Sequence, residues 1–149
     1  MSTLGSQFTS ADDSPGLLLW QVTNRWQAAQ RAVLKPLGLT HVQFVLLASL
    51  THLTADGPVS QRQLAEHAAT DPMMTSQVVR ALESNGWVVR EAHPEDGRAW
   101  ALRVTRSGAA LARKANTAVE KCDLAFFEPL ATKQAAFVRA LRSLRNESA

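Results

Sequence analysis

Residues 60–108 read SQRQLAEHAATDPMMTSQVVRALESNGWVVREAHPEDGRAWALRVTRSG, and this stretch decides the fold. It has the pattern of two short helices followed at once by a charged hairpin with Asp96, Gly97 and Arg98 at its tip. One such helix fits the major groove of DNA, and a basic hairpin tip can reach the adjacent minor groove. The stretch therefore predicts a winged helix-turn-helix.

The helix boundaries inside the stretch follow from capping residues. Ser60 and Gln63 form a capping-box pattern that opens a helix of about two and a half turns. Asp71-Pro72 begins the second helix, because aspartate caps free amides and proline suits the first helical position. Gly86 ends that helix, since a left-handed residue commonly follows a helix C-terminus.

The hydrophobic period changes from helical to twofold after Gly86. Residues 88–90 face a second strand in which Trp100, Leu102 and Val104 alternate with Ala101 and Arg103. This alternation predicts a half-buried strand with the side chains of Trp100, Leu102 and Val104 inside. Thr105 is then placed to cap a long helix.

Amphipathic helices flank this core on both sides. Ser14-Pro15 opens one, Thr40-x-x-Gln43 opens the next, and the long helix after Thr105 breaks at Glu128-Pro129 before Thr132 opens a last one. The first of these helices and the two C-terminal ones need a surface to cover their apolar faces, and a second copy of the chain provides it. A monomer that folds them onto its own core is the alternative.

The expected fold is mainly α with a small β-hairpin wing, a winged helix-turn-helix core carrying N- and C-terminal dimerisation helices. The expected organisation is a disordered N-terminal tail, one dimerisation helix, the DNA-binding domain and the C-terminal dimerisation helices, over residues 1–13, 14–39, 40–108 and 109–149.

Charge alone does not establish nucleic-acid binding. The 149 residues carry a net charge of +3, yet residues 58–108 contain six basic and six acidic side chains, and the excess lies in 109–149. A winged-helix module that binds a protein and not DNA therefore stays open, and individual arginines must decide. The polar start, the lack of a long apolar run and the single Cys122 predict a cytoplasmic protein without a membrane span.

The second short helix has two distinct faces. Thr75, Val79 and Leu82 fall on an apolar stripe together with Val78. The other face suits the major groove, because glutamine can pair with adenine, arginine with guanine or phosphate, and methionine with a thymine methyl. The candidate base-contacting residues are Met73, Ser76, Gln77 and Arg80.

The hairpin supplies the candidate minor-groove residue. Arg98 lies at the tip, and a narrow minor groove attracts an inserted arginine. Asp96 would orient its guanidinium, and Arg90 and Arg103 on the strands would reach flanking phosphates. An ordinary solvated turn with a surface ion pair is the alternative.

The segment DPMMTSQVVRALESNGWV, the Asp96-x-Arg98 wing and the following Thr105-x-x-Gly108 resemble the MarR family of bacterial winged-helix regulators. The resemblance spans about residues 14–146. It implies a homodimer that binds a pseudo-palindromic operator in double-stranded DNA as a transcription regulator, expected to be a repressor. It also implies release of DNA when a small phenolic or other amphipathic effector binds between the DNA-binding and dimerisation regions. Met73 and Met74 depart from the small polar residues common there.

An effector pocket is expected between the first two helices, lined by Trp20, Trp26, His41 and Phe44, although aromatics at this spacing also suit a core or an interface. Cys122 lies on an apolar stripe and is expected to be a packing residue. The four histidines lack metal-ligand spacing, and no catalytic pair emerges, so no metal, cofactor or enzymatic activity is expected.

Overall fold

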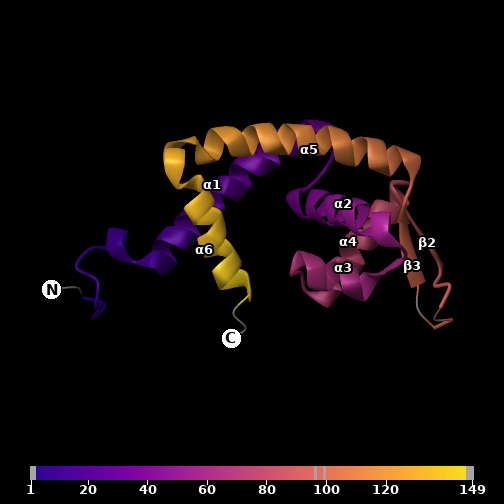
Figure 1. The fold of residues 1–149 in the computed structure, drawn as a ribbon, viewed down its shortest axis with the longest axis horizontal. Helices are drawn as coiled ribbons and strands as arrows, with labels where there is room; N and C mark the ends of the chain where they lie inside the picture. Colours follow the sequence, from indigo (N-terminus) through magenta and orange to yellow (C-terminus); the bar gives the residue numbers. More distant parts are fainter. Residues whose placement is uncertain (1–2, 96, 99, 147–149) are drawn as a thin grey trace.

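The computed structural model describes residues 3–95, 97–98 and 100–146. A long helix, α5, spans the molecule, with α2, α3, α4 and the hairpin below one end and the first and last helices at the other (Figure 1). The elements in chain order are η1 (Ala11–Asp13), α1 (Pro15–Leu34), η2 (Lys35–Leu37), α2 (His41–Leu53), η3 (Thr54–Asp56), β1 (Val59–Ser60), α3 (Gln61–Ala68), α4 (Pro72–Ser84), β2 (Val88–Ala92), β3 (Trp100–Val104), α5 (Arg106–Phe127), η4 (Glu128–Lys133) and α6 (Gln134–Asn146).

Side-chain caps set the helix starts, as the sequence predicts. Thr40 Oγ1 accepts from Gln43 N at 3.2 Å, and the Gln43 side chain accepts from Thr40 N at 3.0 Å. Ser60 and Gln63 form the same reciprocal pair at the start of α3. Gly86 follows α4 with φ of 76°. These local devices fix the ends of α2, α3 and α4.

The wing is part of a three-stranded antiparallel sheet in the order β1-β3-β2, whereas the sequence predicts only a hairpin. β1 has two residues, too short to show a period, and pairs Val59 with Leu102. The predicted burial of β3 is partly wrong. Ala101 is buried because it lies between partners on both sides, while Trp100 pairs with Ala92 towards the wing tip and is 56% exposed.

The start of α6 also differs from the prediction. Thr132 lies inside the 3-10 segment η4, and the α-helix begins at Gln134. Ala131 has φ of 48° and ψ of −120°, a conformation that no helix can continue through. The break that follows Pro129 is therefore longer than the sequence indicates.

Two buried clusters share their boundary residues. One lies inside the winged core and contains Leu47, Val79 and Leu102; the other joins α1, α2 and α5 and contains Leu34 and Phe44. Trp87 and Leu111 pack against both clusters. The winged core and the flanking helices are therefore continuous through α5 and not joined by a flexible linker.

The turn after α4 is locked to the start of α5. Thr105 N donates to Trp87 O at 3.0 Å, and Thr105 Oγ1 donates to Gly86 O at 2.7 Å. Thr105 Oγ1 also accepts from Gly108 N, which caps α5. At Gly108 the helix passes so close that an added Cβ would lie 2.1 Å from Trp87 O. Only glycine allows this approach.

No helix in the described part of the chain is by itself long and apolar enough to span a membrane. Among the described residues, only the two helical segments Pro15–Leu37 and His41–Asp56, taken together, have the length and apolar composition of a span, and the chain bends by 77° between them.

We expect Gly108→Ala to lower the free energy of unfolding by about 2 kcal/mol or more, because the Trp87 carbonyl is backbone and cannot swing aside. Gly16→Ala is the matched control, since its Cβ would meet nothing within 4 Å inside α1. That variant should be within about 0.5 kcal/mol of wild type or slightly more stable. Urea unfolding measures both, and equal values for the two variants would contradict the close packing.

Candidate nucleic-acid interface

Helix α4 has one buried and one exposed face. Thr75, Val79 and Leu82 are fully buried, as the sequence predicts. On the other face Met73 is 71% exposed, Gln77 and Arg80 are exposed, and Ser76 is half-buried. The four candidate base-contacting residues therefore lie together on a surface that a groove could meet.

The start of α4 is fixed by side-chain hydrogen bonds. Asp71 Oδ2 accepts from Met74 N at 2.9 Å and caps the helix. Thr75 Oγ1 donates to Asp71 O at 2.8 Å and lies 2.7 Å from Thr70 Oγ1. These bonds hold α4 against the turn from α3, so its exposed face has a defined orientation.

Arg90 and Arg103 both pair with carboxylates. Arg90 bonds to Glu83 of α4, with both side chains about 30% exposed, and its Nη2 lies 3.5 Å from Gln61 Oε1. Arg103 Nε bonds to Glu91 Oε1 across the hairpin at 2.8 Å, with both side chains more than half exposed. Arg90 therefore connects the wing to α4, whereas the Arg103–Glu91 pair is open to solvent.

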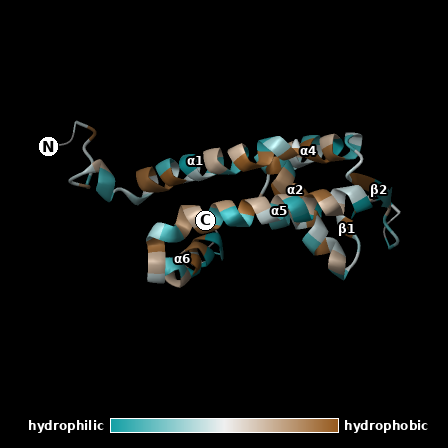
Figure 2. Cartoon of the chain, turned by 90° about the horizontal axis from the view of Figure 1, so that it is seen from above, coloured by the Kyte–Doolittle hydropathy of each residue, from teal (hydrophilic) through white to brown (hydrophobic). Residues whose placement is uncertain are grey.

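The hairpin tip places Arg98 in solvent. Asp96, the expected partner of Arg98, lies outside the described residues. Figures 1 and 2 show α4 and the β2–β3 hairpin at the same end of the molecule, opposite α6 and the N-terminus. A recognition helix and an exposed arginine at a hairpin tip are thus presented from one rigid end.

The residues expected to form the effector pocket separate in the structure. Trp26 and His41 are in edge contact, with ring centroids 5.0 Å apart. Phe44 is 6% exposed and belongs to the buried cluster, while Trp20 is 70% exposed on α1. The structure thus brings two of the four residues together at the α1–α2 junction.

Two polar residues that were not predicted from the sequence, Gln30 and Asp123, complete this junction. Asp123 Oδ1 of α5 accepts from Trp26 Nε1 at 2.9 Å and from Gln30 Nε2 at 2.8 Å. Gln30 is fully buried, and its Oε1 has no hydrogen-bond partner among the residues that the structure describes. Gln30 follows Trp26 by one helical turn, a spacing that could have revealed it. A buried unpaired acceptor is costly and is a position for a donor from a ligand.

His41 is the basic group of this junction, beside the Asp123 carboxylate. Burial lowers the pKa of His41 below its usual 6.5, the positive charge of Arg31 lowers it further, and Asp123 opposes the shift. The imidazole is therefore neutral at neutral pH. The junction offers the indole of Trp26, a neutral imidazole, the Asp123 carboxylate and the amide oxygen of Gln30.

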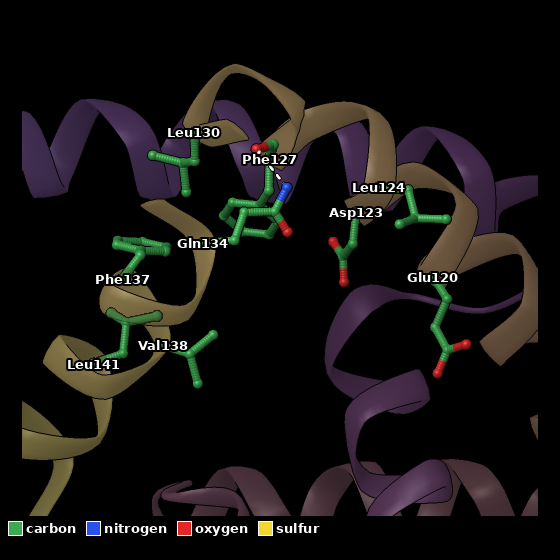
Figure 3. A pocket seen from close by; sticks show the side chains of 9 residues that line it. All are labelled: Glu120, Asp123, Leu124, Phe127, Leu130, Gln134, Phe137, Val138 and Leu141. Atoms are coloured by element: carbon green, nitrogen blue, oxygen red, sulfur yellow. Dashed lines mark hydrogen bonds between the residues drawn. The ribbon is translucent and has the colours of Figure 1, made fainter. Parts of the chain in front are cut away.

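A groove of about 390 Å³ lies between α5 and α6 (Figure 3). Its walls are mainly aromatic and aliphatic, with two carboxylates at the α5 side. The lining residues are Glu120, Asp123, Leu124, Phe127, Leu130, Gln134, Phe137, Val138 and Leu141.

The remaining candidates give no site. Within the described residues no group of three or more His, Cys, Asp or Glu side chains could hold a metal ion. His52 and His67, far apart in sequence, have ring centroids 6.1 Å apart, which supplies only two ligands. Burial, and secondarily Asp123, raise the pKa of the Cys122 thiol, so little reactive thiolate forms.

Comparison with known proteins identifies the fold and its relatives. Residues 39–100 match the model of the MarR family. The chain is 42% identical to the helix-turn-helix transcriptional regulator YdcH of Bacillus subtilis, over 93% of this chain and 95% of the relative. The Mycobacterium tuberculosis MarR family protein Rv2887, solved with salicylic acid, is 36% identical with a TM-score of 0.68, covering 91% and 99%. CouR of Rhodococcus jostii, solved with p-coumaroyl-CoA, is 26% identical with a TM-score of 0.84, covering 95% and 99%.

Proposed function

The chain belongs to the MarR family of helix-turn-helix transcriptional regulators, and on that premise we propose that it is a cytoplasmic repressor. It binds a pseudo-palindromic operator as a homodimer and releases the operator when a small amphipathic effector binds. The observation that carries this proposal is the exposed face of α4 beside the Arg98 wing tip.

The DNA contacts follow from the two exposed groups. Gln77 and Arg80 lie on the outer face of α4, where their amide and guanidinium reach base edges in a major groove. Arg98 enters the neighbouring minor groove from the hairpin tip. In the part of the chain that the structure describes, Arg80 makes no ion pair, so its charge is available to DNA. Arg90 positions the wing through Glu83.

We expect Arg98→Ala to weaken binding to a DNA fragment selected from a randomised pool by about ten-fold, because one groove contact is worth about 1–3 kcal/mol. Wild-type affinity should fall steeply with salt as counterions are released. Arg113→Ala, which removes the same charge from the exposed side of α5, is the control and should bind as wild type does. Fluorescence anisotropy measures all three. Equal affinity of the Arg98 variant, or no DNA binding at low salt, would contradict the proposal.

The dimer rests on apolar surface that the single chain leaves uncovered. None of the 13 residues of α6 is buried, although Val138, Leu141 and Leu144 form an apolar stripe. The first half of α1 exposes Leu19 at 56% and Trp20 at 70%. Figure 2 shows hydrophobic residues along both helices, which lie at the same end of the molecule. A second copy would cover these faces and the α5–α6 groove.

We expect Leu144→Glu to shift the protein from dimer to monomer, because the charge would be buried without a partner. Ser143→Glu is the control on the same helix, where the side chain lies off the apolar stripe. Light scattering coupled to size exclusion gives the mass of each. A monomeric wild type, or a dimeric Leu144 variant at low micromolar concentration, would refute this interface.

The effector site is the junction of Trp26, Gln30, His41 and Asp123. It lies where α1 and α2 meet α5, between the DNA-binding core and the dimerisation helices. An aromatic ligand would stack on Trp26, and a hydroxyl group would donate to the unpaired Gln30 Oε1. Salicylic acid, which the Rv2887 structure holds, is a phenol of this kind.

We expect millimolar salicylate to raise the melting temperature of the wild-type protein and to weaken DNA binding, since a ligand stabilises the state that it binds. Gln30→Leu removes the unpaired acceptor, so salicylate should cause little or no rise in melting temperature and little or no loss of DNA binding in this variant. Gln21→Leu, an exposed position on the same helix, is the control and should keep them. Equal responses of both variants would place the ligand elsewhere.

A further inference from the structure

Two methionines stand side by side on the exposed face of α4. Met73 is 71% exposed and Met74 is 44% exposed, whereas Val79 and Leu82 of this helix are buried and Val78 is half-buried. An apolar side chain so open to solvent is not explained by packing. Met73 shares its face with Ser76, Gln77 and Arg80, the proposed base contacts.

The thioether of Met73 is the sulfur most open to a dissolved oxidant among the described residues. Cys122 is only half-exposed, and burial together with the Asp123 carboxylate raises the pKa of its thiol. A thiol kept protonated reacts slowly with oxidants. Methionine needs no ionisation to react, so exposure decides which sulfur is oxidised first.

On the basis of the proposed DNA binding, we propose that Met73 is an oxidation site through which hypochlorous acid releases the protein from DNA. A lone pair on the Met73 sulfur attacks the chlorine of hypochlorous acid, so an S–Cl bond forms, the O–Cl bond breaks and hydroxide leaves. Water then attacks the sulfur, so an S–O bond forms, the S–Cl bond breaks, and chloride and two protons leave, one of which neutralises the hydroxide. The sulfur loses two electrons, the oxidant gains them, and the product is methionine sulfoxide, which methionine sulfoxide reductases can reverse.

The sulfoxide changes the chemistry of the reading face. The thioether is apolar and suits contact with a thymine methyl, while the sulfoxide adds a polar oxygen at the same place. Burying that oxygen against a methyl group without a donor opposes binding. Met74 is one residue round the helix and is less exposed, so its oxidation should matter less.

The experiment treats the full-length protein with one to a few equivalents of hypochlorous acid. Peptide mapping locates the added oxygen, and anisotropy measures affinity for a fragment selected from a randomised pool. We expect oxidation first at Met73 and about a ten-fold loss of affinity, restored by methionine sulfoxide reductases. The readout is the ratio of affinity after and before treatment, so it does not depend on the starting affinity of each variant. This ratio should stay near one for Met73→Leu and fall about ten-fold for the matched control Met74→Leu.

Each outcome has a distinct meaning. If the untreated protein binds no DNA, the proposed function fails. If the untreated protein binds but its oxidised form binds equally well, or if Met73→Leu is inhibited as strongly as wild type, this inference alone is overturned. Cys122→Ser should respond as wild type does, and its protection would assign the effect to the thiol instead.

Discussion

The close approach of α5 to the turn after α4 is the constraint on which the rest of the structure depends. Gly108 packs against the Trp87 backbone, and Thr105 bonds to both Gly86 and Trp87. The recognition helix ends at this turn, and the wing begins there. One contact therefore sets the angle of α4, the origin of the hairpin and the direction of α5. A looser junction would leave the exposed face of α4 and the wing tip without a fixed relation to α5 and to the proposed dimer face.

This constraint bears on how a winged core with no net charge would bind DNA in the way proposed above. Each of three acidic residues of the core is engaged by an arginine, in the pairs Arg62–Glu66, Arg90–Glu83 and Arg103–Glu91. The half-buried Glu83 pair connects α4 to β2 and so contributes to shape more than to potential. Surface pairs add little stability, and in solution they compete with phosphates for the same guanidinium groups. In the proposed mode of binding, Arg80 on α4 and Arg98 at the wing tip are held in fixed positions, and this placement takes the role that a basic surface patch has in other DNA-binding proteins.

Local signals in the sequence predicted most of the fold. Caps at Thr40, Ser60 and Asp71 act within four residues, so they can be read directly. The two-residue strand β1 and the burial of Ala101 could not be predicted from the sequence, because both depend on pairing between distant segments. The site shows the same division: the exposed face of α4 follows from helical periodicity, whereas Asp123 meets Trp26 across 97 positions of sequence. Helix periodicity places a residue on a face but not opposite its partner.

The shared helix α5 links the two sites physically. Gly108 at its start holds the DNA-reading end, and Asp123, about 22 Å along at 1.5 Å per residue, holds α1 through Trp26 and Gln30. No proline interrupts the helix between them, so it moves as a rod. A ligand that inserts beside Gln30 must change the α1–α5 contact, and α1 also carries part of the proposed dimer face. The separation of two recognition helices in a dimer would then respond to the ligand, because both ends of the rod are fixed.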